Sequence, residues 1–346
     1  MRLWALFFFI CCGHLFGYDP IDIVYTWVDG SDPVWAAKRD FYMQRDKPWC
    51  KEGTLAQRFR DKDELKYSLR SIYAFAPFVR HIFIVTDGQR PKWLKDHPRI
   101  TVVSHQDIFR WKEHLPVFNS EAIEANLHRI PGLAERYIYF NDDVFLGRPV
   151  TPNDFFTEKG KIRFYEGRKI PNVPLMKDPT SLNRRAWNTS EELKRVYGHD
   201  IELHFFHHTP HAMRKTVVRH AEQMFPHVFK SCSADRFRSS TTYRTTSCLI
   251  QYVGLYTERA QASKTTFHDF PFRASSYCNR RHMDTIITKR PTFFCVQDLT
   301  PREASAEATG ALSRFFEEYF PTPAPWEKQD KNNAIKRKKQ VTLATR

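Results

Sequence analysis

Short apolar runs alternate with segments of helical periodicity along the first half of the chain. The β-branched run at residues 22–26 predicts a strand, and the segment between Asp63 and Pro77 places its apolar side chains at helical spacing. A second helix is expected to begin at Ser120. Three more apolar runs predict strands at residues 81–86, 100–105 and 137–140. Strands that alternate with helices in this way are typical of an α/β fold.

Helical patterns dominate the second half. They predict helices at residues 213–225, 245–256 and 304–319, with one strand at residues 292–296. Short apolar strands joined by helices usually form a largely parallel sheet with helices on both faces, and such sheets bind ligands beyond the carboxyl ends of their strands. We therefore expect an α/β fold with a largely parallel sheet covered on both faces, plus a helix-rich second half.

The two ends of the chain differ from the part between them. Residues 1–17 carry Arg2, an apolar run and a small-residue end, which predicts a secretory signal peptide, with an uncleaved signal anchor as the alternative. We therefore expect the protein in the lumen of the secretory pathway (Golgi or ER) or outside the cell, membrane-anchored if the leader is retained. Residues 321–346 pass from prolines to a run of Lys and Arg, which predicts a basic, disordered tail.

Composition and charge narrow the class of protein. The 346 residues are 41% hydrophobic, which excludes a disordered, collagen-like or coiled-coil chain. Lys and Arg number 54 against 39 Asp and Glu, a formal net charge of +15. Such a basic surface predicts an anionic partner, which could be a phosphorylated small molecule, a nucleic acid or an acidic membrane. A secretory leader argues against nucleic acid.

Cysteine usage and one sequon fit an oxidising compartment. Of seven Cys, two lie in the predicted leader, so the remaining five leave at least one unpaired within the chain. No CxxC and no close Cys/His cluster occurs in the sequence, which argues against a structural zinc site. Asn188 begins an Asn-Thr-Ser acceptor pattern for glycosylation.

Two adjacent carboxylates follow the last predicted strand of the first half. Asp142 and Asp143, preceded by Asn141, can share a divalent cation whose other ligands are water and diphosphate oxygens, and Mg²⁺ suits that arrangement. The alternative is a solvated turn, because Asp and Asn are ordinary turn residues.

A second acidic turn follows the first predicted strand. Asp29 and Asp32 flank Gly30, which permits close backbone approach to a ligand, and Trp27 offers a stacking face for a base or a sugar. A tight Asp-Gly turn beside a core tryptophan would have the same sequence.

Histidine and arginine are dense in the second half. Residues 203–219 include His211 and Arg219, and histidine can act as a general acid or base near neutral pH while arginine neutralises phosphate. A structural or exposed role remains the alternative for any single histidine. Arg236 and Arg238 in one turn, and Asp298 at the end of a predicted strand, are weaker candidates.

Taken together, these segments resemble the Stealth family of sugar-1-phosphate transferases. That family includes bacterial capsular polysaccharide phosphotransferases and the catalytic part of the N-acetylglucosamine-1-phosphotransferase that marks lysosomal enzymes. The matching segments occur in the expected order at residues 21–33, 63–89, 105–109, 139–144, 208–213, 236–238 and 294–298.

The resemblance implies a Rossmann-like catalytic domain over residues 18–320. It would move a hexose or N-acetylhexosamine 1-phosphate from a nucleotide-sugar donor such as UDP-GlcNAc to a glycan hydroxyl, with Mg²⁺ or Mn²⁺ as cofactor, and release a nucleoside monophosphate. The resemblance carries over Asp29 and Asp32 for the donor side, in the same turn as the donor-binding candidates Trp27 and Gly30. It also carries over Asp142 and Asp143 for the metal, His211 as acid or base, Asp298 as a further catalytic residue, and Arg219, Arg236 and Arg238 for the diphosphate.

Two departures from the family pattern keep other functions open. Gln297 stands where the family usually has Asn, and residues 239–243 lack the acid that relatives often place there. The alternatives are a metal-dependent glycosyltransferase that releases a nucleoside diphosphate, and a catalytically inactive module that binds a polyanion or glycan. The sequence leaves the oligomeric state open.

Overall fold

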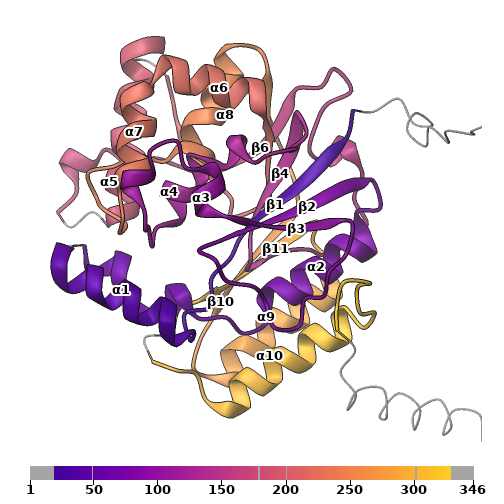
Figure 1. The fold of residues 1–346 in the computed structure, drawn as a ribbon. Helices are drawn as coiled ribbons and strands as arrows, with labels where there is room; N and C mark the ends of the chain where they lie inside the picture. Colours follow the sequence, from indigo (N-terminus) through magenta and orange to yellow (C-terminus); the bar gives the residue numbers. More distant parts are fainter. Residues whose placement is uncertain (1–18, 49, 178–179, 200, 301, 329–346) are drawn as a thin grey trace, which may run out of the picture.

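The computed structural model describes residues 19–328, apart from residues 49, 178–179, 200 and 301, so the predicted leader and residues 329–346 lie outside it. At its centre is a five-stranded sheet in the order β3-β2-β1-β4-β8 (Figure 1). The first four of these strands are parallel, and β8 is antiparallel to its neighbour β4. The strands are β1 (Ile21–Thr26), β2 (Val79–Thr86), β3 (Ile100–Ser104), β4 (Arg136–Asn141) and β8 (His211–Arg214).

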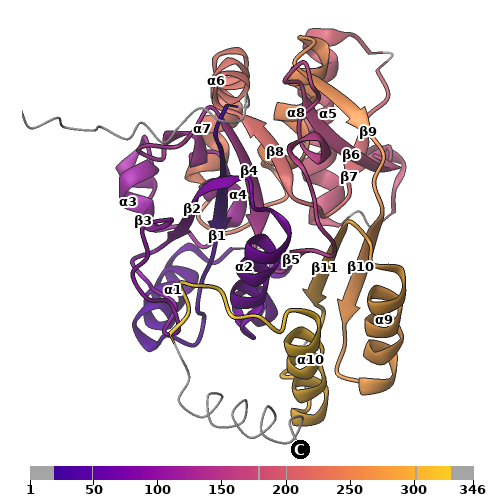
Figure 2. The ribbon, with the colours of Figure 1, turned by 90° about the vertical axis from the view of Figure 1, so that its right-hand side faces the viewer.

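Helices lie above and below this sheet in the views of Figures 1 and 2. On one side is α2 (Glu64–Phe75), whose Leu65, Leu69 and Ile72 are all buried, as their helical spacing predicts. On the other side are α4 (Ser120–Glu124), α6 (Lys215–Met224) and α7 (Pro226–Ala234), with α3 (His105–Ile108) after β3. The prediction of a mixed α/β fold with largely parallel strands is confirmed, and the order 3-2-1-4 matches the first four strands of the usual doubly wound order.

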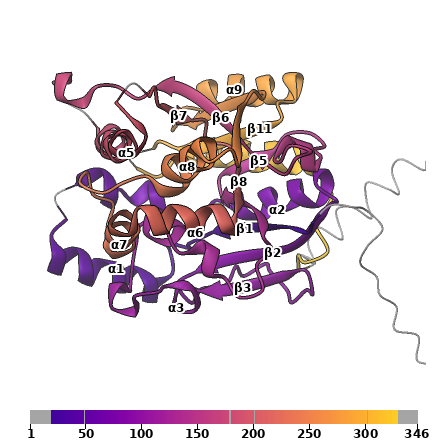
Figure 3. The ribbon, with the colours of Figure 1, turned by 90° about the horizontal axis from the view of Figure 1, so that it is seen from above.

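Two smaller sheets lie on the β8 side of the main sheet, away from β3 (Figures 2 and 3). The first has the order β10-β11-β5 and packs against α9 (Ser276–Lys289) and α10 (Ala306–Tyr319), through an aromatic cluster that includes Phe145 and Phe316. The second has the order β7-β6-β9. Their strands are β5 (Val144–Leu146), β6 (Ile162–Lys169), β7 (His204–Phe206), β9 (Ala260–Ser263), β10 (Phe267–Phe272) and β11 (Phe293–Asp298).

The second half therefore contains more strand than its helical periodicity predicts. The helices at 245–256 and 304–319 are present as a π-helical turn (Thr245–Leu249) continued by α8 (Ile250–Tyr256), and as α10. The helix predicted from residue 213 starts two residues later, because residues 211–214 pair with β4 instead. A further helix, α5 (Ser181–Tyr197), was not predicted. Strands of three or four residues, such as β7 and β9, are too short to show a period of two.

The ordered chain extends beyond residue 320, where the sequence analysis places the start of a disordered tail. Trp326 is fully buried, and the Nε and Nη2 atoms of Arg70 donate hydrogen bonds to the carboxylate of Glu327 at 2.8 and 2.7 Å. Residues 321–328 thus belong to the folded domain, because a buried indole and a two-pronged ion pair hold them against α2.

In the described part of the chain, no helix combines the length and the apolar character that a bilayer span requires.

The five cysteines outside the predicted leader are all free, and Cys278 alone among them is exposed.

Replacing the buried tryptophan tests whether this C-terminal segment supports the fold. We expect Trp326→Ala to lower the free energy of unfolding by roughly 3–5 kcal/mol, because it removes a fully buried aromatic side chain and leaves a cavity. Urea denaturation followed by circular dichroism measures the change. Tyr277→Ala, at a side chain that is 82% exposed, is the control and should change stability by no more than about 0.5 kcal/mol. Equal effects of the two substitutions would contradict the assignment.

Candidate active site

The carboxyl ends of β1 and β4 open into a cleft of about 880 Å³. Thr26 pairs with Asn141 in the parallel register, so the residues that follow the two strands lie at the same edge of the sheet. The cleft also reaches the end of β11 and the loop before β8. It brings together six of the residues singled out from the sequence, which are Trp27, Asp142, Asp143, His211, Arg238 and Asp298.

One end of the cleft is crowded with carboxylates. Asp142 lies in the turn between β4 and β5, where enclosure by the protein, followed by the charges of Asp143, Glu64 and Asp61, holds its pKa well above the usual range. Burial also raises the pKa of Glu64 to about 8 and that of Asp61 to about 6. Asp61 and Glu64 were not predicted as site residues, because nothing in their local pattern separates them from ordinary surface acids before a helix.

This acidic end fits a divalent cation. The Oδ1 atom of Asp143 is buried and has no hydrogen-bond partner. Burial, and after it the repulsion by Asp143, Glu64 and Asp61, raises the pKa of Asp142. A hard divalent cation such as Mg²⁺ binds carboxylate oxygens, and its positive charge would offset that repulsion. Asp142 and Asp143 are therefore suitable ligands, and the identity of the ion remains a prediction.

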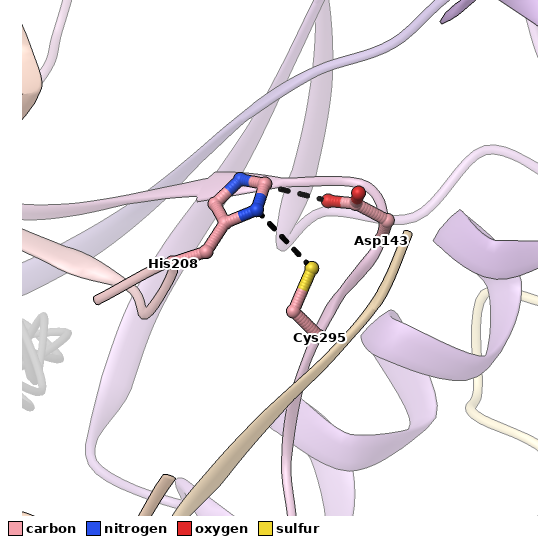
Figure 4. Close-up of side chains that lie close together, drawn as sticks. All are labelled: Asp143, His208 and Cys295. Carbon is pink, nitrogen blue, oxygen red and sulfur yellow. Dashed lines mark hydrogen bonds and ion pairs between the residues drawn. The ribbon is translucent and has the colours of Figure 1, made fainter. Parts of the chain in front are cut away.

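His208 stands next to this acidic end, on the loop between β7 and β8 (Figure 4). Its Nε2 lies 3.2 Å from Oδ1 of Asn141 and 4.0 Å from Oδ1 of Asp143. Its Nδ1 lies 2.7 Å from Nε2 of Gln297 and 3.3 Å from Sγ of Cys295. Because an amide nitrogen only donates, Nδ1 accepts from Gln297 and the ring proton sits on Nε2.

His211, the histidine that the family resemblance implies as acid or base, lies in the wall of the cleft instead. Its side chain is buried in β8 and stacks on Tyr139, with ring centroids 6.4 Å apart. Burial, reinforced by the nearby His208 and Arg244, lowers the pKa of His211 to about 3. An imidazole with such a pKa stays neutral at physiological pH and is a weak base, which makes His208 the better-placed histidine for proton transfer.

The other end of the cleft is rich in arginine. Glu121 forms an ion pair with Arg185 and lies 3.8 Å from Nε of Arg244. Burial opposes ionisation of Glu121, but the charges of Arg185, Arg238 and Arg244 outweigh it and keep the carboxyl pKa below its usual value. Arg58 also borders this end. Arg58, Arg185 and Arg244 belong to no motif, so they were not predicted from the sequence.

A chain of hydrogen bonds links the two ends of the cleft. His208 contacts Asn141, and Nδ2 of Asn141 donates to the hydroxyl of Tyr139 at 3.2 Å. That hydroxyl donates to Oε1 of Glu124 at 3.1 Å. Burial and the charge of Glu121 raise the pKa of Glu124 to about 7.

Asp298 lies at the cleft but its carboxylate is already engaged. It forms an ion pair with Lys62 and accepts hydrogen bonds from Arg60 at 3.2 Å and from the Thr300 hydroxyl at 2.5 Å. Burial acts to raise its pKa, yet the hydrogen bonds from Lys62 and Thr300 outweigh burial and lower it. The structure thus shows Asp298 joining the segment before α2 to the end of β11, and its predicted catalytic role remains a prediction.

Three of the residues predicted for the donor side build a turn outside the cleft lining. Asp32 caps α1 (Pro33–Asp46) by accepting from the backbone N–H groups of Val34 and Trp35, at 2.9 and 3.3 Å. Asp29 accepts from the Ser31 backbone and hydroxyl. A Cβ atom at Gly30 would come within 2.3 Å of the Phe59 carbonyl oxygen, so packing against that backbone requires glycine.

Trp27, by contrast, borders the cleft. Its indole is largely buried and donates from Nε1 to Asp61 at 3.1 Å.

Two of the three arginines predicted to bind the diphosphate, Arg219 and Arg236, lie outside the lining of the cleft. Arg219 borders a separate pocket beside α6 and α7. Arg236 forms an ion pair with Asp46 at 2.7 Å and donates to the carbonyl of Pro116.

The structure also argues against glycosylation at Asn188. This residue lies inside α5, where its Nδ2 donates to the carbonyl oxygens of Ser240 and Thr242 at 3.1 and 2.9 Å. A glycan on that nitrogen would have to displace both bonds.

Comparison with known protein families gives matches in four parts of the chain. The profile for Stealth protein CR1, conserved region 1, matches residues 19–47, and that for conserved region 2 matches residues 58–164. Conserved region 3 matches residues 207–255 and conserved region 4 matches residues 284–337. The acidic turn, His208 and β11 fall within these regions.

Bacterial exopolysaccharide phosphotransferases are similar over most of the chain. One from Streptomyces coelicolor is 39% identical over 320 residues, which cover 90% of this chain and 53% of the relative. One from Nocardia farcinica is 39% identical over 323 residues (90% and 62%), and CpsY of Mycobacterium leprae is 40% identical over 316 residues (89% and 57%). The chain thus spans between half and two thirds of the length of these relatives.

Among solved structures, the galactosyltransferase LgtC in complex with donor and acceptor sugar analogues aligns with 90% of this chain and 98% of its own, at 12% identity and a TM-score of 0.43. A likeness this low does not establish a shared fold.

The buried carboxylates predict a measurable dependence of stability on pH. In the unfolded chain the Glu64 carboxyl would lose its proton near pH 4.5, whereas in the folded protein it keeps the proton up to about pH 8. The contribution of Glu64 to stability is therefore fully present below pH 4.5 and is lost as the pH rises through 8. We expect Glu64→Gln to stabilise the protein relative to wild type at pH 8 and much less at pH 5, with a difference that grows by up to about 1.4 kcal/mol per pH unit.

Urea unfolding at the two pH values, in EDTA to exclude cations, measures this difference. Glu318→Gln, at an exposed position on α10, is the matched control and should show no such dependence. A stability gain of the same size at both pH values for Glu64→Gln would show that Glu64 does not titrate as described.

Proposed function

The chain belongs to the Stealth family, and from this premise we propose that it is a phosphotransferase that acts on a polysaccharide. In this proposal it takes a nucleotide-sugar, moves the sugar together with one phosphate to a glycan hydroxyl, and releases a nucleoside monophosphate. The single observation that carries the proposal is a cleft with crowded carboxylates at one end, arginines at the other, and His208 beside the carboxylates.

The distribution of charge suits a diphosphate. At the basic end, the three guanidinium groups of Arg185, Arg238 and Arg244 lie near the single carboxylate of Glu121. The positive charges of these arginines therefore outnumber the negative charge of Glu121. Arginine side chains recognise phosphate oxygens through charge-assisted hydrogen bonds. At the acidic end, Asp142 and Asp143 would hold Mg²⁺ or Mn²⁺, which would supply neutralisation of diphosphate charge. A donor that lies along the cleft would meet both.

The transfer would proceed in line at the β-phosphorus. An oxygen–phosphorus bond forms between the acceptor hydroxyl and the β-phosphorus while the bond from that phosphorus to the bridging oxygen breaks. The bridging oxygen leaves with the α-phosphate as the nucleoside monophosphate, and the product is a sugar–phosphate–glycan diester. Phosphoryl transfer depends mainly on positioning and charge stabilisation. Arg238 and Arg244 border the cleft and would provide both.

His208 is the residue that we assign to the proton of the acceptor hydroxyl. Its Nδ1 lone pair accepts from the amide of Gln297, so an acceptor hydroxyl that displaced that amide would meet the basic nitrogen directly. Its Nε2–H is oriented by Asn141, which fixes the tautomer. The assignment moves the role implied for His211 to its neighbour in the loop.

The proposal extends to the donor, the acceptor and the cellular location. UDP-GlcNAc is one donor among the nucleotide-sugars to test, and a polysaccharide acceptor agrees with the names of the bacterial relatives. The leader expected at residues 1–17 would direct the protein to the secretory lumen or to the cell exterior.

The identity of the released nucleotide tests the proposed reaction. The full chain is incubated with UDP-GlcNAc and other nucleotide-sugars, a panel of glycan acceptors, and Mg²⁺, Mn²⁺ or EDTA, and products are identified by mass. We expect cation-dependent release of a nucleoside monophosphate together with a phosphodiester product. Release of a nucleoside diphosphate would identify a glycosyltransferase instead, and donor binding by calorimetry without turnover would identify a binding module.

A matched pair of histidine variants tests the role of His208. We expect His208→Gln to lower kcat by roughly 10²–10⁴-fold, the usual contribution of a general acid or base, with little change in KM for the donor. His211→Gln should keep kcat within about tenfold of wild type, because the pKa of His211 is too low for it to carry a proton at neutral pH. The reverse ranking of the two variants would return the role to His211.

A further inference from the structure

Three potential metal ligands of different chemistry meet in the cleft beside the carboxylate end (Figure 4). They are Asp143 from the turn after β4, His208 from the loop before β8, and Cys295 from β11. One ligand atom from each lies within 4.8 Å of the others. Nδ1 of His208 is 3.3 Å from Sγ of Cys295, and Nε2 of the same ring is 4.0 Å from Oδ1 of Asp143. In the part of the chain that the structure describes, no other group of three such side chains meets this closely.

A set of one carboxylate, one imidazole and one thiol suits a different ion from Mg²⁺. Mg²⁺ takes oxygen ligands, whereas thiolate and imidazole select zinc and similar transition metals. Zinc sites that remain open to solvent or substrate commonly use three protein ligands and leave the fourth position free. Asp143 and His208 border the cleft, so a fourth position would be accessible there.

The surroundings already hold two of the three side chains in place. Cys295 is fully buried in the middle of its sheet, paired with Asp269 of β10 on one side and with Val144 of β5 on the other. Asn141 accepts from Nε2–H of His208 and leaves Nδ1 on the side of the Cys295 sulfur. A second-shell acceptor on one ring nitrogen is the arrangement that orients histidines at metal sites.

We propose that Asp143, His208 and Cys295 form a three-ligand site for a thiophilic divalent cation of the zinc class. The proposal rests on the proposed function in one respect, because Asp143 and His208 are also assigned to the transfer reaction. A zinc-class ion on these ligands would occupy the carboxylate that holds Mg²⁺ and the imidazole that handles the proton. Zinc is therefore expected to inhibit the Mg²⁺-dependent transfer reversibly, through a thiol that the transfer itself does not use.

Cobalt(II) is the probe for the site, because a cobalt–thiolate bond gives a charge-transfer absorption that carboxylate and histidine ligands do not. The full chain, reduced and free of other metals, is titrated with Co²⁺. We expect a thiolate band that saturates at one equivalent, disappears when Zn²⁺ is added, and is absent in Cys295→Ser. Cys248→Ser, at another buried free cysteine, is the matched control and should keep the band.

The outcomes separate this proposal from the proposed function. Absence of the band in wild type, its persistence in Cys295→Ser, or its loss only in a variant of the exposed Cys278 would overturn the site, whatever the activity. Circular dichroism of Cys295→Ser, and a second variant Cys295→Ala, exclude loss of the band through misfolding. If the band behaves as expected and no nucleotide is released under any condition, the site stands and the proposed function fails.

Where the chain is active, Zn²⁺ inhibition gives a second measurement. The concentration of Zn²⁺ needed for half inhibition should rise at least about tenfold in Cys295→Ser, equivalent to about 1.4 kcal/mol, and stay unchanged in Cys248→Ser. Equal inhibition of wild type and Cys295→Ser would show that zinc acts elsewhere.

Discussion

Burial of several carboxylates together, near the ends of β1 and β4, is the constraint around which the cleft is organised. Burial is the main cause that raises the pKa values of Asp142, Glu64 and Asp61, and the charges of neighbouring acids add to it. Such a cluster costs folding free energy in the absence of a cation, and proteins tolerate this cost mainly at functional sites. The ion pair of Lys62 with the nearby Asp298 adds a positive charge beside the cluster, and Lys62 opposes the rise in the pKa of Glu64.

The rest of the architecture holds this cluster in register. The parallel pairing of β1 with β4 places Trp27 and Asp142 at the same edge of the main sheet. A buried hydroxyl on α2 then links β1 to β5. The Ser68 hydroxyl accepts a hydrogen bond from the hydroxyl of Tyr25 in β1 at 2.7 Å and donates to the carbonyl of Val144 in β5 at 2.5 Å. Since β5 pairs with β11, the small sheet carries Cys295 and Gln297 to His208. Residues more than 150 positions apart thus meet through one continuous set of backbone and side-chain bonds.

The two departures from the family pattern have structural explanations that leave the cleft intact. Gln297, in place of the usual Asn, reaches Nδ1 of His208 at 2.7 Å, so the longer side chain contacts the imidazole. The segment without the expected acid forms a turn around Asp235, which accepts from the Ser239 backbone at 3.2 Å and the Thr242 hydroxyl at 2.9 Å. The positive charge of the basic end is supplied by Arg185 and Arg244 as well as Arg238.

The sequence by itself determined the alternation of strands and helices, the acidic turn at Asp142 and Asp143, and the order of the family segments, because periodicity and motif spacing are local properties. Only the tertiary structure decided which histidine faces the carboxylates. His208 and His211 are three residues apart with similar surroundings in the sequence, but pairing of residues 211–214 with β4 buries one and leaves the other in the loop. The tertiary structure alone also decided that Arg185, Arg244 and Cys295 lie at the site. Their positions depend on pairing between distant segments, which no local sequence pattern indicates.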